Sequence, residues 1–344
     1  MMKYKPLSNT GVLVSELCLG AMTFGGKGFW KAIGEQNQEE VNQLVKTAVD
    51  KGVNFIDTAN VYSEGLSELL LGKALHELGI HRQQVVIATK LRGRMGEGVN
   101  QVGLSRLHIA DSVNDSLQRL NMDHIDLLYI HGVDLITPLE ETMRGLEDAV
   151  RSGKVRYLGI SNHPAWMVVK ANGIAACMGW TKFVALQNYY TIATRDVERE
   201  IVPMALSERL ALMPWSPLAG GFLSGKFTRR NDRAGNRRRD EFDFPPINKE
   251  KAYDIIDLMA TIAGNHKSSV AQVALAWLRY KPAVTSTIIG AKNIAQLLDN
   301  LASVDLSLSY DEMQQLDELS APVTEYPAWM LERQGQGRVP KDSE

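Results

Sequence analysis

Short apolar runs alternate with amphipathic segments along most of the chain, and this alternation limits the fold more than any other feature. Each run is short enough for a buried strand, and apolar residues at helical spacing follow it. The predicted strands end at Gly20, Asp57, Lys90, His131, Ser161, Gln187, Ser216 and Gly290. The predicted helices cover residues 39–51, 67–79, 106–120, 138–152, 165–179, 196–209, 252–265, 269–280 and 294–303. Eight parallel strands joined by right-handed crossovers can close into a barrel. We therefore predict an α/β fold, a single (β/α)8 TIM barrel.

A doubly wound open sheet is the alternative fold for this pattern. Such sheets usually bind dinucleotides through a Gly-x-Gly-x-x-Gly turn between a strand and a helix. The glycine-rich stretch at 19–26, Leu-Gly-Ala-Met-Thr-Phe-Gly-Gly, has a different spacing. A dinucleotide would therefore have to be bound in another way.

We predict one domain over residues 1–344, with several segments added to the barrel. Residues 4–14 place two short apolar runs around Ser8-Asn9-Thr10-Gly11, which predicts an N-terminal hairpin. A glycine-rich insertion at 91–103 follows the third strand, and a long loop at 217–248 follows the seventh. Long connections of this kind are usually functional or disordered. A helix near 310–319 leads into a C-terminal tail at 321–344.

The composition is that of an ordinary globular chain. The formal net charge of −2 gives no reason to expect nucleic acid or an anionic membrane as a partner. Cys18 and Cys177 lack the spacing of a metal site, and we expect both to be buried in a reducing compartment, with no metal bound. Neither a signal peptide nor a run of roughly 18 apolar residues is present, which predicts a cytoplasmic protein.

Three successive predicted strands end in residues that carry chemistry. Asp57, Lys90 and His131 occupy these ends, and Tyr62 lies in the loop after the first of them. Taken singly, such residues are more often helix caps or solvated side chains. The carboxyl ends of neighbouring parallel strands meet at one rim, however, and barrel enzymes keep their active sites there. We therefore predict that all four side chains converge on one site.

Several motifs, in order from Tyr4 to about Ser320, resemble those of the aldo-keto reductases. The chain is most similar to the bacterial-type branch that includes the potassium-channel beta subunits, in which the loop after the seventh strand is long. The motifs are Leu-Gly-Ala-Met-Thr-Phe-Gly at 19–25, Phe-Ile-Asp-Thr-Ala-Asn-Val-Tyr at 55–62, Leu-Tyr-Ile-His at 128–131, Gly-Lys-Val-Arg-Tyr-Leu-Gly-Ile-Ser-Asn at 153–162, Ile-Ile-Gly-Ala-Lys at 288–292 and Gln-Leu-Leu-Asp-Asn at 296–300.

The resemblance implies an NADPH-dependent reductase that converts aldehydes or ketones to alcohols. Hydride addition places negative charge on the carbonyl oxygen, so a proton donor has to stand beside it. Tyr62 would donate that proton, because the Lys90 ammonium stabilises the phenolate that remains. Asp57 would hold Lys90 and offset its burial, while His131 would hydrogen-bond the substrate oxygen.

The resemblance also implies a set of cofactor-binding positions. Ser161, Asn162 and Gln187 would bind the carboxamide, and Trp215 would lie against the nicotinamide ring. The belt across the pyrophosphate corresponds to Ser216, Pro217, Leu218, Gly220 and Lys226, and the adenosine pocket to Gly290, Lys292, Gln296, Asp299 and Asn300. Gly20, Met22 and Asp57 complete the predicted cofactor site.

Two positions depart from the usual pattern of the family. Gln296 stands where many members carry arginine, which leaves Lys292 as the predicted cation for a 2′-phosphate. The arginines at 237–239 could assist Lys292 or could belong to a solvated loop. Gly132 follows His131 where many relatives have a basic residue or proline. The resemblance therefore does not predict the shape of this loop on the substrate side.

Other functions compete with the reductase. A nucleotide-binding regulatory or scaffold subunit with slow turnover would keep the same cofactor site. A carboxylate-pair hydrolase using Asp57 and Glu64 would need a second acid at another strand end, and no end supplies one. The predicted partner is a small carbonyl compound, and a homo-oligomer is compatible with the sequence. Aromatic residues that favour an apolar or aromatic carbonyl are Phe24, Phe29, Trp30, Tyr326 and Trp329.

Overall fold

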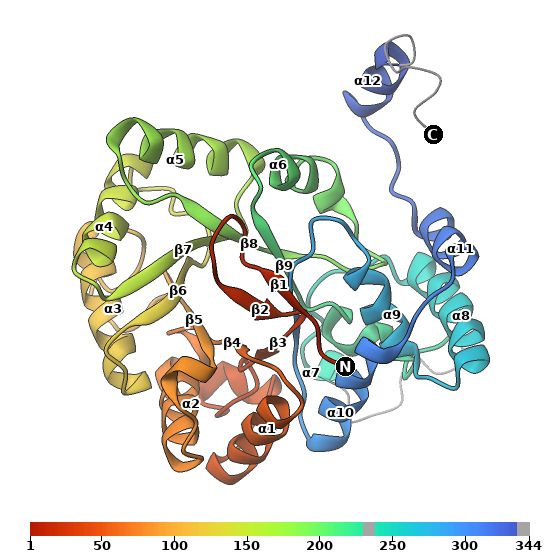
Figure 1. The fold of residues 1–344 in the computed structure, drawn as a ribbon, viewed down its shortest axis with the longest axis horizontal. Coiled ribbons are helices and arrows are strands. Elements are labelled where there is room, and N and C mark those ends of the chain that lie inside the picture. Colours follow the sequence, from red (N-terminus) through yellow and green to blue (C-terminus); the bar gives the residue numbers. More distant parts are fainter. Residues whose placement is uncertain (230–237, 336–344) are drawn as a thin grey trace.

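Eight parallel strands form a nearly closed barrel in the computed structural model, which describes residues 1–229 and 238–335 (Figure 1). Neighbouring strands follow the order β10-β3-β4-β5-β6-β7-β8-β9. Backbone pairing of Leu212 with Val284 joins β9 to the chain just before β10 and so completes the circle. The strands are β3 (Leu17–Gly20), β4 (Phe55–Asp57), β5 (Val86–Leu91), β6 (Ile125–Ile130), β7 (Val155–Ser161), β8 (Phe183–Tyr189), β9 (Ala211–Trp215) and β10 (Thr287–Ile289). The predicted barrel is confirmed.

Helices follow the strands around the outside of the barrel (Figure 1). They are α1 (Gln38–Asp50), α2 (Leu66–Glu77), α3 (Arg106–Leu120), α4 (Leu139–Arg151), α5 (Ala165–Met178), α6 (Ile201–Ser207), α7 (Arg238–Glu241), α8 (Lys249–His266), α9 (Val270–Arg279), α10 (Ile294–Ala302), α11 (Tyr310–Ser320) and α12 (Ala328–Gly335). The single helix predicted at 196–209 is wrong, because a 3-10 turn at Asp196–Glu198 precedes α6. Pro203 has no N–H to continue the hydrogen-bond ladder of a longer helix, although it is tolerated in the first turn of α6.

The predicted N-terminal hairpin is present and closes one end of the barrel. Strands β1 (Tyr4–Pro6) and β2 (Leu13–Ser15) pair antiparallel, and the hairpin lies across the barrel in Figure 1. Leu7 and Val14 are fully buried and belong to the same apolar cluster as Cys18 and Phe55 inside the barrel. Because side chains fill this end, the opposite rim is left as the place for a site.

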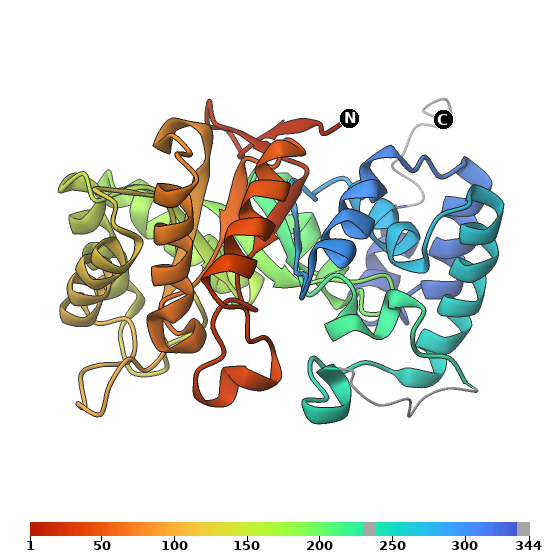
Figure 2. The same cartoon turned by 90° about the horizontal axis from the view of Figure 1, so that it is seen from below.

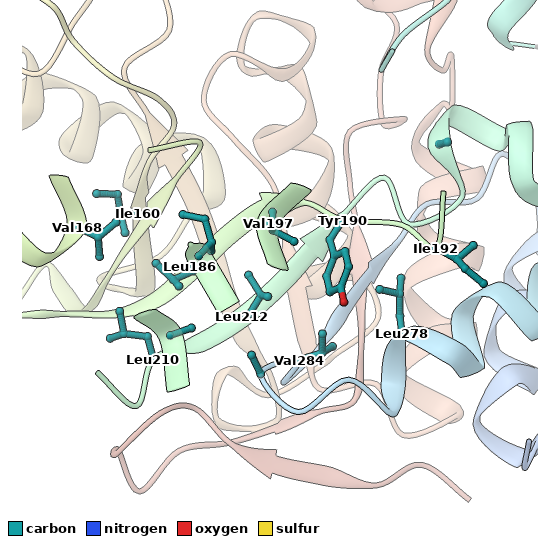
Figure 3. Packing of buried hydrophobic residues seen from close by; sticks show 14 of the residues in the cluster. Ile160, Val168, Leu186, Tyr190, Ile192, Val197, Leu210, Leu212, Leu278 and Val284 are labelled. Carbon is teal, nitrogen blue, oxygen red and sulfur yellow. The ribbon is translucent and has the colours of Figure 1, made fainter. Parts of the chain in front are cut away.

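A second apolar layer lies between the barrel and its helices. Figure 3 shows part of it, where Leu186 of β8 and Leu212 of β9 belong to one cluster with Leu278 of α9. Cys177 was expected to be buried as well, but it is exposed near the end of α5, where the helix surface faces solvent. That expectation is therefore wrong, while Cys18 is buried as expected.

The loops at the carboxyl ends of the strands extend to the side opposite the hairpin (Figure 2). They include a 3-10 segment, η1 (Gly28–Ala32), after β3 and another, η5 (Ala219–Ser224), together with α7, after β9. Helix α12, in the predicted tail, stands away from the barrel in Figure 1. Within residues 1–229 and 238–335, no helix has the length and apolar content needed to cross a membrane.

Candidate active site

Asp57 and Lys90 form a buried ion pair at the rim of the barrel. Asp57 pairs with Ala88 in the strand register, and Lys90 lies two residues farther along β5, on the same face of that strand. The Lys90 Nζ atom is 2.5 Å from Asp57 Oδ1, and it also donates to the Thr58 carbonyl oxygen at 2.8 Å. Gln187 donates from Nε2 to the other carboxylate oxygen of Asp57 at 2.9 Å. Every charge-bearing atom of the pair is therefore engaged.

Tyr62 completes this arrangement. The Lys90 ammonium donates to the Tyr62 hydroxyl oxygen at 3.1 Å, and the phenol ring is almost entirely buried. Ser63 and Glu64 follow with positive φ angles of 49° and 56°, which produce a tight turn. The Ser63 hydroxyl fixes the turn, since it donates to the Phe24 carbonyl and accepts from the Gly26 N–H, both at 3.0 Å. A proton-bearing oxygen is thus held beside a fixed positive charge.

His131 faces Tyr62 from the end of β6. The two ring centroids are 5.7 Å apart, and the backbone N–H of His131 donates to the Leu91 carbonyl. Burial lowers the pKa of His131 to about 3, and the positive charges of Lys90 and Arg92 act in the same direction. The imidazole is therefore neutral at physiological pH and can donate one hydrogen bond to a substrate oxygen.

Lys90 keeps its charge because its partners outweigh the effect of burial on its pKa. Burial by itself would lower the pKa of Lys90, but the Asp57 carboxylate and the Tyr62 oxygen raise it above its ordinary value. Burial also raises the pKa of Asp57, against the pull of Lys90 and of the hydrogen bond from Gln187. Lys90 therefore stays protonated, and its charge persists next to the Tyr62 oxygen throughout the physiological range.

The residues predicted to bind the carboxamide lie beside this group. Ser161 donates from Oγ to the Gln187 carbonyl at 2.8 Å, which ties the ends of β7 and β8 together. Asn162, with φ of 56°, donates to the His131 carbonyl at 3.2 Å and accepts from the Trp215 indole N–H at 3.0 Å. Trp215 is partly exposed at the rim, and its ring centroid lies 5.0 Å from that of Tyr189 and 6.0 Å from that of Phe244.

The predicted pyrophosphate belt forms a series of tight turns after β9. The Ser216 hydroxyl accepts from the Gly220 N–H at 2.9 Å, while Pro217 and Leu218 lie between these two residues. Gly220 and Gly221 both have positive φ, and a Cβ on Gly220 would lie 2.6 Å from the Phe244 carbonyl oxygen. Glycine is thus required at 220 for the close backbone approach. Lys226 follows in the same segment and is exposed.

Arg239 holds this belt in place, a role that the sequence did not indicate. Its Nη1 donates to the Ala219 carbonyl at 2.6 Å, its Nη2 is 2.5 Å from Asp243 Oδ1, and its side chain is buried. The Arg239 guanidinium is buried, so the expectation of a solvated loop does not describe this residue. Arg237 and the side chain of Arg238 lie outside the part of the chain that the structure describes.

The predicted adenosine residues gather around the start of α10. Gln296 accepts from the Lys292 N–H at 2.9 Å, and Asn300 donates to the Gly290 carbonyl at 3.1 Å. Asp299 accepts hydrogen bonds from Gln272 of α9 and from Ser269, the N-cap residue of the same helix. The Lys292 side chain is exposed. These contacts leave Lys292 available to a negatively charged ligand.

The remaining predicted positions lie at the ends of β3 and β6. Gly20 pairs with Asp57, and a Cβ there would lie 2.8 Å from the Ile288 side chain, so the barrel wall itself requires glycine. Met22 is partly exposed at the rim, whereas Phe24 is fully buried and cannot line the substrate side as expected. A Cβ on Gly132 would meet no atom within 4 Å, which leaves the space after His131 open.

The hydrolase alternative finds no support in the geometry. Glu64 is exposed and forms an ion pair with Lys27 at 2.8 Å, while Asp57 is committed to Lys90. In the part of the chain that the structure describes, no three His, Cys, Asp or Glu side chains are grouped to hold a metal ion. The groups that this rim brings together are the hydroxyl of Tyr62, the ammonium of Lys90 and the imidazole of His131.

Comparison with known proteins places the chain among oxidoreductases. The model of the aldo/keto reductase family matches residues 16–321. Versiconal hemiacetal acetate reductase of Aspergillus parasiticus is 37% identical over 95% of this chain and 99% of its own length. An aryl-alcohol dehydrogenase [NADP(+)] of Phanerodontia chrysosporium is 36% identical over 90% and 83% of the two chains. A probable voltage-gated potassium channel subunit beta of Oryza sativa is 35% identical over 89% and 92%.

Proposed function

This chain belongs to the aldo/keto reductase family, and from that premise we propose that it reduces aldehydes or ketones to alcohols with NADPH. The observation that carries the proposal is the contact of the Tyr62 hydroxyl with the Lys90 ammonium, 3.1 Å away, which is itself paired with Asp57. This arrangement supplies a proton at one point of the rim and stabilises the oxygen that has lost it.

A nicotinamide cofactor, when bound, supplies the hydride that adds to the carbonyl carbon. Tyr62 gives its proton to the carbonyl oxygen, and the Lys90 ammonium stabilises the resulting phenolate. Neutral His131 donates a hydrogen bond to the same oxygen and so fixes the direction of the carbonyl. Asp57 keeps Lys90 charged and in position, which makes it a positioning residue rather than a catalytic one.

The residues beside this group fit a nicotinamide dinucleotide. Ser161, Asn162 and Gln187 offer amide and hydroxyl groups within one hydrogen-bonded cluster, and the partly exposed Trp215 offers a flat ring. Lys292 is exposed immediately before α10, whose N-terminus adds a partial positive charge for a phosphate. The Phanerodontia relative is named as an NADP(+) enzyme, which supports the same choice of cofactor.

A slow regulatory subunit is the second candidate, because the Oryza relative is named as a channel subunit. The two functions differ in turnover. We expect the purified protein to oxidise NADPH in the presence of a panel of aldehydes and ketones, with Tyr62→Phe as the matched control. Cofactor binding with negligible turnover on every carbonyl in the panel would favour the regulatory function and contradict the reductase.

A further inference from the structure

Arg92, directly after β5, has a backbone conformation that residues with a side chain rarely adopt. Its φ angle is 128°, although it is not glycine. Two backbone hydrogen bonds hold the chain there, both at 2.9 Å: the His131 N–H donates to the Leu91 carbonyl, and the Gly103 N–H donates to the Arg92 carbonyl. Strained residues of this kind cluster at functional sites, so the position of the Arg92 side chain is informative.

The Arg92 side chain lies over the loop that follows His131. Its Nε and Nη2 atoms both donate to the Val133 carbonyl, at 3.1 and 2.9 Å. Burial and the charge of Lys90 lower the pKa of His131, and the charge of Arg92 adds to this effect, so the guanidinium is near the imidazole. A Cβ on Gly132 would meet no atom within 4 Å. Arg92 therefore places a positive charge beside open space at the rim.

One edge of the Arg92 guanidinium is left for a ligand. A guanidinium has five N–H donors, and the Val133 carbonyl takes one from Nε and one from Nη2. The edge formed by Nη1 and Nη2 keeps two parallel N–H groups, and Arg92 forms no ion pair within the described part of the chain. The carboxylate of Asp134, next to Val133, instead accepts from the N–H groups of Leu104 and Ile136.

We propose that Arg92 is an anion subsite beside the reacting group, and that this protein prefers carbonyl compounds that carry a carboxylate. The inference rests on the proposed function, because it places the carbonyl oxygen between Tyr62 and His131. The free edge of the guanidinium matches the two oxygens of a carboxylate. Arg92 follows Lys90 by two residues, roughly 6.6 Å along a strand, so a benzene ring with the two groups at opposite ends has a suitable length.

The test compares kcat/KM for 4-formylbenzoate and for its methyl ester in the wild type and in Arg92→Gln. The two aldehydes are similar in size and in carbonyl reactivity, but only the first is an anion. We expect the wild type to favour the anion. In Arg92→Gln the ratio of the two values should fall on the order of 5- to 30-fold, between the effects of an exposed ion pair and of a charge-assisted hydrogen bond.

Two further measurements support this comparison. Arg92→Lys keeps the charge but lacks the parallel N–H groups, so it should retain part of the preference for the anion. Added salt should lower the wild-type ratio, because ions screen a charge at an exposed site. This second measurement needs no variant, and turnover of the methyl ester shows whether each variant is folded.

Arg94 provides the matched control. It is an exposed arginine of the same loop, but its Nη1 donates to the Gly96 and Gly98 carbonyls, and its charge does not contribute to the lowered pKa of His131. Arg94→Gln should leave the ratio unchanged. An unchanged ratio in Arg92→Gln, an equal loss for both aldehydes, or the same fall in Arg94→Gln would overturn the inference and leave the reductase function standing. A wild type that reduces neither aldehyde overturns both.

Discussion

Replacing Lys90 with methionine should destabilise the folded protein, although the two side chains are similar in shape. Methionine keeps most of the length of the side chain but removes the ammonium that lies 2.5 Å from Asp57 Oδ1. Both side chains are buried, so the Asp57 carboxylate would be left without its ion partner and with only Gln187 as a side-chain donor. Breaking a buried pair from one side costs about 3–5 kcal/mol.

The expected change in melting temperature follows from the length of the chain. An unfolding entropy of about 2.1 cal/mol/K per residue means that 1 kcal/mol shifts the Tm by about 1.4 °C in a chain of this length. Lys90→Met should therefore lower the Tm by about 4 to 7 °C. Tyr62→Phe removes a single hydrogen bond worth about 0.5–1.5 kcal/mol, so its Tm should fall by no more than about 2 °C.

The pH dependence of the same variant provides a second measurement. Removing the ammonium raises the folded-state pKa of Asp57 further above its unfolded value, in the direction in which burial already shifts it. The free-energy cost of burying the unpaired carboxylate is absent below the pKa that Asp57 has in the unfolded chain. This cost grows as the pH rises toward the higher pKa of Asp57 in the folded protein. The Tm difference between wild type and Lys90→Met should consequently be smaller at pH 5 than at pH 8.

A double variant serves as the control for this reasoning. Adding Asp57→Asn to Lys90→Met removes the stranded charge, and the amide has a shape close to that of the carboxylate. We expect part of the lost stability to return, because removing both partners of a buried pair is much less costly than removing one. Equal melting temperatures for Lys90→Met and Tyr62→Phe, or no recovery in the double variant, would refute the buried ion pair.

Three further predictions concern catalysis, the cofactor and acid stability. Tyr62→Phe should lower kcat on the order of 10²- to 10⁴-fold while the Kd of NADPH stays close to wild type, and wild-type turnover would remove Tyr62 as the donor. Lys292→Ala should weaken the binding of NADPH by tenfold or more, because a charge-assisted hydrogen bond contributes about 1.5–3 kcal/mol. The affinity for NADH should be almost unchanged, and binding isotherms for both cofactors decide this. His131 is neutral in the folded state, because its pKa is lowered to about 3. Protonation of this imidazole in the unfolded chain therefore lowers the stability of the protein as the pH falls from about 6.5 toward 3. In His131→Gln, which cannot titrate, the decline in Tm on acidification should be shallower, and parallel curves would contradict the depressed pKa.

The alternation of strands and helices could be predicted because it depends on local periodicity. A buried strand and an amphipathic helix each leave a repeat in the sequence, so the eight strands, with ends correct to within two residues, and most helix limits follow from the chain itself. The gathering of Asp57, Lys90 and His131 was predictable for the same reason. Carboxyl ends of parallel strands meet at one rim, so their order along the chain already implies that the three residues are neighbours.

Contacts between loops were decided only by the tertiary structure. Arg239 belongs to a run of arginines that is consistent with a solvated loop, yet its guanidinium is buried against the Ala219 carbonyl and Asp243. Phe29 and Phe242 meet across the rim, and Asn162 joins the His131 carbonyl to Trp215. None of these contacts leaves a periodic signal, because the paths of the loops depend on which surfaces the closed barrel brings together. The sequence by itself therefore determined the barrel and the convergence of Asp57, Lys90 and His131 on one rim, and the folded chain decided what surrounds them.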